Sequence, residues 1–319
     1  MNKNLPLMSS FYLVSLMGMV SSAHWFMFWI FLELNTLCFI PLILSKKTKK
    51  SGEASLLYFI VQSISSMYLL VAMINEESWM MNLSEANTNL ILVALLKMSA
   101  GLFFNWVFLL SFSLTLTILL LTLSIQKLGA FFILLMSQPE FSSLILMFIV
   151  LSSVMAASIN MKQNLFKSML SVSSLSNTSW LITSSLISCP TWMFYFMVYT
   201  LTLALTPMMN KNFLNQNYRN FKIMENPVLF LSMSGLPPLP GFFPKIMILM
   251  ETSFHRLTWL SMFLLTWACV DIFIYLRFSY SSALKNNSNF VFQHTKTVSI
   301  TKLATLMATV IMSVMAMTW

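Results

Sequence analysis

Residues 234–245 read SGLPPLPGFFPK, with four prolines within eight residues of an apolar segment. A proline inside a helix removes a backbone donor and clashes with the preceding turn, so this segment cannot form one continuous helix. At membrane depth, unwound backbone is tolerated only where protein or water satisfies its polar groups, as in the broken helices of transporters. The stretch predicts a helix break followed by Lys245, which can exchange protons with water in the gap; the break is formed by Gly235, Pro237, Pro238, Pro240, Gly241 and Pro244.

The composition places the whole chain in a membrane. Hydrophobic residues make up 58% of the 319 residues and charged residues only 8%, which excludes a soluble globular protein. A helix that crosses the bilayer needs about 20 mostly apolar residues. Eleven such segments are predicted, at 6–22, 24–44, 54–74, 88–110, 112–135, 142–159, 168–188, 190–208, 228–250, 257–279 and 299–318. They are too long for barrel strands, so the predicted fold is an all-α polytopic membrane bundle.

The loops between these segments indicate one membrane domain, 1–319, because they are too short to bury an extramembrane core. The net charge is +9, but the basic residues form no soluble patch with interleaved aromatic residues, so no nucleic-acid partner is expected. If the N-terminus lies on the inner side, every basic loop residue except Arg256 lies there too, and Glu76, Glu77 and Glu85 lie outside. The positive-inside rule therefore favours an inner N-terminus and an outer C-terminus.

Four charged side chains lie near the centres of apolar segments: Glu33, Lys97, Lys127 and Lys245. Such a charge costs about 2.5–3.5 kcal/mol on insertion scales, so it faces the protein interior and marks an ion or proton path. Burial brings the protonation of these groups within reach of neutral pH, and a neighbouring opposite charge then decides which state is populated. The alternative is that the four charges are tolerated without a role.

The spacing of two lysines favours an inverted repeat. Lys97 lies in the fourth predicted helix and Lys245 in the ninth, five helices apart. An odd repeat length reverses the orientation, as in many transporters. The prediction is therefore a first repeat at 6–135, a second at 142–279 and a C-terminal helix at 299–318.

Three segments together resemble a known family. Besides residues 234–245, they are WIFLELN at 29–35 with FIPLI at 39–43, and EASLLYF at 53–59. They are similar to the subunit 2 family of NADH dehydrogenase, the antiporter-like, proton-pumping membrane subunits of mitochondrial complex I. The resemblance covers nearly the whole chain, and eleven helices are similar to the shortened animal form.

The resemblance implies a subunit of the proton-translocating NADH:ubiquinone reductase, bound to other membrane-arm subunits in the mitochondrial inner membrane. The N-terminus is then on the matrix side and the C-terminus on the intermembrane-space side. No glycine-rich phosphate loop, cysteine cluster or haem motif occurs in the sequence, so no redox chemistry or cofactor is expected in this chain. NADH, FMN, iron–sulfur clusters and ubiquinone are expected in partner subunits.

The resemblance also assigns roles to the buried charges. Glu33 matches the family's glutamate at the subunit boundary, Lys97 its first-repeat lysine, Lys127 its central lysine and Lys245 its second-repeat lysine. The expected mechanism has Glu33 modulate Lys97 and Lys127 relay protons along the membrane plane. Lys245 exchanges protons with one aqueous side.

The predicted helix at 168–188 is rich in serine, which serves either helix packing or the lining of a water file. Ser173, Ser174 and Trp180 match a serine pair and a tryptophan on a water-lining helix of the family. Asn177 stands where that helix often has a histidine. Ser173, Ser174 and Asn177 are therefore the water-lining candidates.

The chain departs from the family after Lys97. A Pro-Phe-His-Phe-Trp-Phe-Pro type of run usually follows that lysine, whereas residues 102–108 read LFFNWVF, without the prolines or the histidine. Gly101 permits a local distortion there. Ala130 stands where a proline often follows the central lysine.

Two other functions fit the same sequence. A cation/proton antiporter subunit of the same superfamily shares the buried lysines and the broken helix. A passive membrane scaffold needs neither. Asp271 matches no residue of the family, and an ion pair with a neighbouring helix is expected for it.

Overall fold

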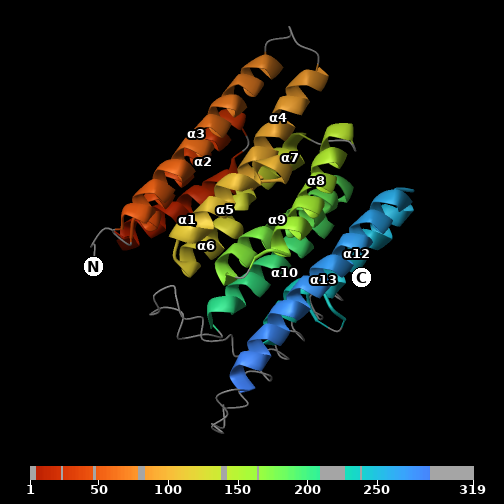
Figure 1. Ribbon diagram of the computed structural model, residues 1–319. Coiled ribbons are helices and arrows are strands. Elements are labelled where there is room, and N and C mark those ends of the chain that lie inside the picture. Colours follow the sequence, from red (N-terminus) through yellow and green to blue (C-terminus); the bar gives the residue numbers. More distant parts are fainter. Residues whose placement is uncertain are drawn as a thin grey trace. The chain divides into compact units, whose positions relative to one another are not determined.

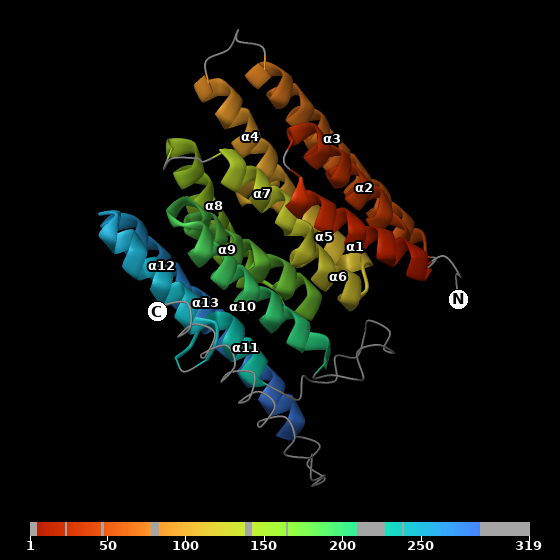
Figure 2. The same ribbon diagram turned by 180° about the vertical axis from the view of Figure 1, so that it is seen from behind.

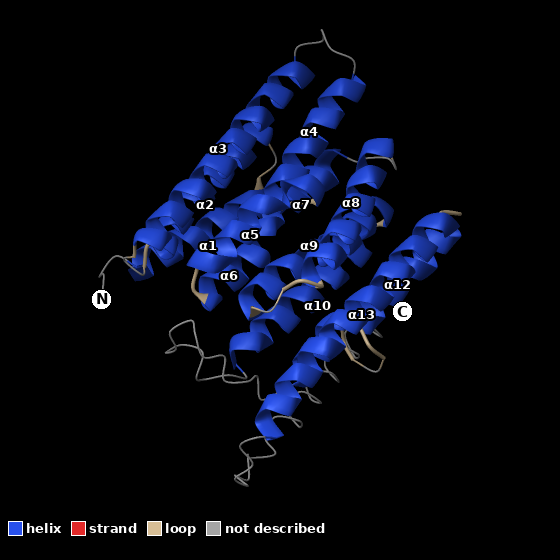
Figure 3. Ribbon diagram, in the orientation of Figure 1, coloured by secondary structure: helices blue, strands red, loops and turns tan. Residues whose placement is uncertain are grey.

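Helices are the regular elements of this protein. The computed structural model describes residues 5–22, 24–45, 48–77, 83–137, 142–163, 165–208, 227–237 and 239–287, and within these ranges every regular element is an α- or 3-10 helix (Figures 1 and 3). The predicted helix at 299–318 and Pro238 lie outside the described residues. The protein is thus an all-helical membrane protein, in which six described segments are long and apolar enough to cross a bilayer, at Trp25–Ile43, Lys49–Ile74, Thr88–Ser113, Leu116–Ser137, Ser143–Asn160 and Thr258–Tyr280.

The chain divides into two compact units, 1–186 and 187–319. The first unit begins with four long helices, which pack in order, each against the next (Figures 1 and 2). They are α1 (Leu5–Ser21), α2 (Trp25–Ile43), α3 (Lys49–Glu77) and α4 (Leu83–Met98). Apolar stripes on these helices bury Phe28, Phe39 and Tyr58, which accounts for the packing.

The rest of the first unit consists of shorter helices and two long ones. The elements are η1 (Gly101–Phe104), α5 (Asn105–Ser113), α6 (Leu116–Leu123), η2 (Ile125–Lys127), α7 (Leu128–Ser137), α8 (Ser143–Asn160) and α9 (Phe166–Ile187), the last ending at the boundary of the unit. α7 packs against α4, α5 against α3, and α8 against η1. A small apolar core, built from Phe104, Ala156, Val172 and Leu175, joins η1 to α8 and α9.

The second unit contains α10 (Cys189–Met208), α11 (Pro227–Ser234), α12 (Phe242–Phe254) and α13 (Thr258–Asn287). α10 contacts both α11 and α12, and each of these also contacts α13. The turn at 255–257 joins α12 to α13, and α13 presents a buried face with Leu260, Leu264 and Tyr275.

The described helices begin and end close to the predicted segments, but three of those segments are interrupted. The segment predicted at 88–110 contains α4, η1 and α5, that at 112–135 contains α6, η2 and α7, and that at 228–250 contains α11 and α12. Each interruption lies beside one of the lysines that the sequence singles out. The two compact units are divided at a different place from the predicted repeats, which stay a prediction.

Candidate functional site

Lys97, Lys127 and Lys245 are all buried, with only 5%, 2% and 7% of each residue exposed. Glu33 is half-buried on α2. Lys97 is the last but one residue of α4, Lys127 ends η2, and Lys245 lies in the first turn of α12. A helix interruption leaves backbone carbonyls without helical partners, and a carbonyl is a good partner for a buried cation; Lys245 bonds to such a carbonyl at the end of α11.

The helix that carries Lys97 ends in a Schellman motif. Ser99 has a φ of 60°, the N–H of Ala100 donates to Leu95 O at 2.9 Å, and the N–H of Ser99 donates to Leu96 O at 3.1 Å. Trp106 Nε1 also donates to Leu96 O, at 3.3 Å. The chain is therefore broken here without a proline: Gly101 also has a positive φ, 52°, so the distortion that the sequence permits at this glycine is present.

Glu33 and Lys97 are brought together by α3. The Ser66 hydroxyl donates to Glu33 Oε1, and Lys97 Nζ donates to Gln62 Oε1 at 3.4 Å. Gln62 and Ser66 are four residues apart, so they project from the same face of α3, one turn apart. The charges of Glu33 and Lys97 also interact electrostatically. The structure thus places a carboxylate, a bridging helix face and a lysine in one site.

Several buried polar atoms near this site have no protein partner among the described residues. They are the hydroxyls of Tyr12 and Tyr58, Asn35 Oδ1 and Gln126 Nε2. Tyr58 interacts electrostatically with both Tyr12 and Glu33. Since buried polar groups are normally hydrogen-bonded to protein or to ordered water, these atoms are suited to bond water molecules in the interior.

A second hydrogen bond leads toward Lys127. Asn35 Nδ2, on α2, donates to Gln126 Oε1 at 3.0 Å, and Gln126 directly precedes Lys127. Lys127 Nζ in turn donates to the backbone carbonyl of Ser174, on α9, at 3.2 Å. In the first unit, a side-chain hydrogen bond therefore links α2, the helix that carries Glu33, to η2, the short helix that carries Lys127.

The helix interruption before Lys127 contains no proline or glycine that would predict it from the sequence. α6 ends at Leu123, and Ser124 has φ −109° and ψ −87°. The Ser124 hydroxyl donates to Leu120 O at 2.6 Å, a bond back to the preceding turn that competes with helical geometry. This serine is the one local signal for the break, and it is a weak one.

The three water-lining candidates on α9 are all buried. The hydroxyls of Ser173 and Ser174 donate to Leu170 O at 2.9 Å and Ser171 O at 2.7 Å, and Asn177 Nδ2 donates to Ser173 O at 2.9 Å. These bonds within the helix leave oxygen lone pairs as acceptors. Within this group, the carbonyl oxygen of Ser174 accepts a hydrogen bond from Lys127 Nζ.

The proline run separates α11 from α12. α11 ends at Ser234, Gly235 has a φ of 80°, and the N–H of Leu236 reaches back to Leu231 O at 3.5 Å. Lys245 Nζ donates to Ser234 O at 2.9 Å, so the ammonium group binds the negative end of the α11 dipole. A Cβ atom on Gly235 would lie 3.1 Å from Lys245 Cδ, which shows how closely the lysine covers the break.

Sequence reasoning missed Gln62, Ser66 and Gln126, since their roles depend on contacts between helices. It expected an ion pair between Asp271 and a neighbouring helix; in the structure Asp271 interacts electrostatically with Lys245 on α12. The part of the chain that the structure describes holds no group of three or more His, Cys, Asp or Glu side chains placed for a metal ion.

Comparisons with known proteins agree on one family. The family described as NADH:quinone oxidoreductase/Mrp antiporter, TM, matches residues 22–272. NADH-ubiquinone oxidoreductase chain 2 of Locusta migratoria is 30% identical over 280 residues, which cover 83% of this chain and 81% of that protein. The chain 2 protein of Canis rufus is 28% identical over 300 residues, with 86% of each covered.

Solved structures show the same fold. A chain of respiratory complex I from Thermus thermophilus superposes with a TM-score of 0.75 at 20% identity, covering 86% of this chain and 69% of that one. A chain of the Mrp complex from Dietzia sp. gives a TM-score of 0.72 at 12% identity, with 85% and 59% covered. Both similarities indicate an antiporter-like helical fold.

Proposed function

Because the chain belongs to the NADH:quinone oxidoreductase/Mrp antiporter transmembrane family, as an NADH-ubiquinone oxidoreductase chain 2 protein, we propose that it moves protons through Glu33, Lys97, Lys127 and Lys245. It is a proton-translocating, multi-pass membrane-arm subunit of the respiratory enzyme in the mitochondrial inner membrane. Other membrane-arm subunits are its partners.

The observation that carries this proposal is the bridge between Glu33 and Lys97. A carboxylate and a buried lysine meet the same face of α3, through Ser66 and Gln62. At an effective dielectric constant of about 20, unit charges held about 8 Å apart by intervening side chains interact by about 2 kcal/mol, which is roughly a thirtyfold change in a protonation equilibrium. A change in the charge of Glu33 therefore loads or unloads Lys97.

Lys127 is the relay in this proposal. Its backbone neighbour Gln126 accepts a hydrogen bond from Asn35, and its own ammonium group bonds to Ser174 O. A proton that arrives at Lys127 meets buried polar groups on two helices rather than lipid. Ser173, Ser174 and Asn177 line the adjacent water file, because their oxygens keep acceptor capacity.

Lys245 exchanges protons with one aqueous side at the break between α11 and α12. Between α11 and α12 the chain leaves the helical hydrogen-bond pattern, so water can bond its backbone groups, and Lys245 already reaches the last carbonyl of α11, Ser234 O, at 2.9 Å. This arrangement supports Gly235, Pro237, Pro240 and Gly241 as residues of the gap. Pro238 lies outside the described residues, and Pro244, expected at the break, lies in the first turn of α12.

The remaining features of the proposal follow from the sequence. The chain crosses the membrane eleven times, with repeats at 6–135 and 142–279, the N-terminus in the matrix and the C-terminus in the intermembrane space. It forms one membrane domain. NADH, FMN, iron–sulfur clusters and ubiquinone bind partner subunits, and this chain binds no cofactor.

The fold similarity to a chain of the Mrp complex supports one alternative, a cation/proton antiporter subunit. The same lysines and the same helix break would serve that function. Proton uptake measured with and without sodium separates the two, because only the antiporter needs the cation.

The test of the proposal is Lys245→Ala in the assembled complex, reconstituted in vesicles. We expect NADH-driven proton uptake to be abolished or strongly lowered at an unchanged amount of complex. Lys162→Ala is the matched control, since Lys162 is exposed just after α8. Normal pumping by Lys245→Ala would remove the assigned role and favour a passive scaffold.

A further inference from the structure

α13 carries a buried carboxylate that the proposed pathway does not use. Asp271 is only 5% exposed, and Leu264 and Ile274, on the same face of α13, are fully buried. A lone carboxylate in apolar surroundings is strongly unfavourable, so a buried aspartate needs a partner of opposite charge. That partner has to come from a helix packed against α13.

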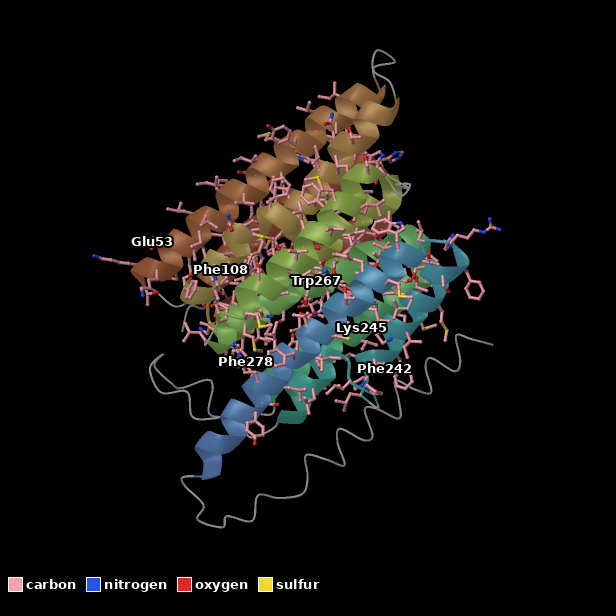
Figure 4. All side chains as sticks on the ribbon, turned by 45° about the vertical axis from the view of Figure 1, so that its right-hand side comes forward. Glu53, Phe108, Phe242, Lys245, Trp267 and Phe278 are labelled. Carbon is pink, nitrogen blue, oxygen red and sulfur yellow. The ribbon has the colours of Figure 1, made fainter. Side chains whose placement is uncertain are left out.

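Lys245 supplies the positive charge. α12 and α13 form a helical hairpin and contact each other, and Figure 4 shows Lys245 where α12 runs beside α13. Lys245 lies 10 residues before the turn at 255–257 and Asp271 lies 14 residues after it, a difference of about one helical turn. Both are buried, and their charges attract each other. The hairpin therefore brings two opposite charges within about one helical turn of each other, which the long lysine side chain can span.

Three tyrosines complete the surroundings of this pair. Tyr195 and Tyr199 lie one turn apart on α10, and Tyr275 lies one turn after Asp271 on α13; all three are buried. Tyr195 interacts electrostatically with Tyr199, Asp271 and Tyr275. The cluster of Lys245, Asp271 and these tyrosines thus joins α10, α12 and α13, three helices of the second unit.

The site around Lys97 in the first unit contains the same kinds of residue as this cluster in the second unit. There a lysine at a helix interruption, Lys97, interacts with a carboxylate from another helix, Glu33, and a buried tyrosine, Tyr58, interacts with that carboxylate. In each unit, then, a lysine next to a broken helix has an acidic partner and a phenol group. The likeness lies in these residue types and in their interactions.

We propose that Asp271 is the counter-charge of Lys245 and holds the proton-loaded state of that lysine in the second unit. This inference rests on the proposed function of Lys245. When Lys245 Nζ takes up a proton, the ammonium group and the Asp271 carboxylate form an ion pair. When the proton leaves to water, the amine is neutral and the carboxylate keeps its charge beside the buried tyrosines. Asp271 is thus a positioning residue that acts through Lys245.

The first experiment compares Asp271→Asn with Asp271→Glu in the full complex, reconstituted in vesicles. Asn keeps the shape but removes the charge, so Lys245 holds its proton less well. We expect proton uptake per NADH to fall severalfold, and the alkaline limb of its pH profile to move about one pH unit toward acid, a tenfold change in the protonation equilibrium. Asp271→Glu restores both. Glu53→Gln, an exposed acid on α3, is the matched control.

The second experiment keeps the inference testable if Asp271→Asn prevents assembly. Neutralising one member of a buried pair leaves the other uncompensated, whereas neutralising both removes that penalty. We therefore expect the double variant Lys245→Gln/Asp271→Asn to assemble in larger amounts than either single variant. Complex abundance in native gels measures this, and it does not depend on pumping.

The outcomes separate this inference from the proposed function. If Lys245→Gln pumps normally, the role of Lys245 is removed, whatever Asp271 does. If Lys245→Gln stops pumping while Asp271→Asn keeps the wild-type rate and pH profile, only the pairing is overturned. A double variant that assembles no better than the poorer single variant also overturns the pairing.

Discussion

Lys97 Nζ lies 3.4 Å from Gln62 Oε1, one helical turn along α3 from the serine that donates to Glu33. The lysine and the glutamate therefore share a bridging helix as well as an electrostatic interaction. Substituting Gln62 or Ser66 on α3 therefore tests this bridge without replacing a charged residue.

Gln62→Glu tests the lysine end of the bridge. A carboxylate in place of the amide stabilises the ammonium form of Lys97, which then keeps its proton up to a higher pH. We expect the alkaline limb of the pumping pH profile to move toward alkaline pH, and Gln62→Met to move it the opposite way or lower pumping severalfold. Ser63→Ala on the same helix is the control, since its hydroxyl donates only to Ile60 O.

Ser66→Ala tests the glutamate end. Hydrogen bonds to charged groups contribute about 1.5–3 kcal/mol, so losing this donor removes the contact between α3 and Glu33. We expect a severalfold drop in proton uptake per NADH at an unchanged amount of complex. Ser65→Ala is a close match, because Ser65 is equally buried but its hydroxyl donates to Gln62 O of its own helix at 2.7 Å. Equal effects of the two changes would contradict the bridge.

Asn35 and Gln126 test the link to Lys127. Their side chains are joined at 3.0 Å across α2 and η2, so replacing either by alanine breaks the same bond. We expect the single variants and the double variant to lower pumping to a similar extent, with a coupling of about 1 kcal/mol in a double-mutant cycle. Strictly additive losses would show that the two side chains act separately.

Gly235→Ala tests the break that carries Lys245. Gly235 has a φ of 80°, and an added Cβ would lie 3.1 Å from Gly241 O. A left-handed alanine costs about 1–2 kcal/mol, and the backbone has to shift as well. We expect a lower melting temperature of the purified complex and weaker pumping. Gly52→Ala is the control: its Cβ would meet open space, and alanine favours a helix by about 1 kcal/mol.

The described helices were predictable because a helix that crosses a bilayer needs a long apolar segment. The break before Lys245 was predictable because four prolines precede that residue. The break beside Lys97 was expected only as a distortion that Gly101 permits, and it involves positive φ values at both Ser99 and Gly101. The break beside Lys127 was not predicted, since it depends on Ser124 bonding to the preceding turn. Serine is common in this chain, and most described serines bond to their own helix without interrupting it. Local sequence therefore does not distinguish the two that do.

The charged positions were predictable from their cost in hydrocarbon, but their partners were not. Gln62 and Ser66 are ordinary polar residues in an apolar segment until α2, α3 and α4 are packed together. Asp271 was visible as a charge, yet its partner lies on α12, and the packing of α12 against α13 is what brings the two charges near each other.

The bond from Lys245 Nζ to Ser234 O gives the second unit a mechanical property. An ammonium group binds the C-terminal end of α11 more tightly than a neutral amine does, because its positive charge attracts the partial negative charge there. In the proposed mechanism, each proton that Lys245 binds thus strengthens the contact between α11 and α12, and each proton that it loses weakens that contact. In this proposal, the protonation state of Lys245 and the stiffness of the contact between α11 and α12 change together.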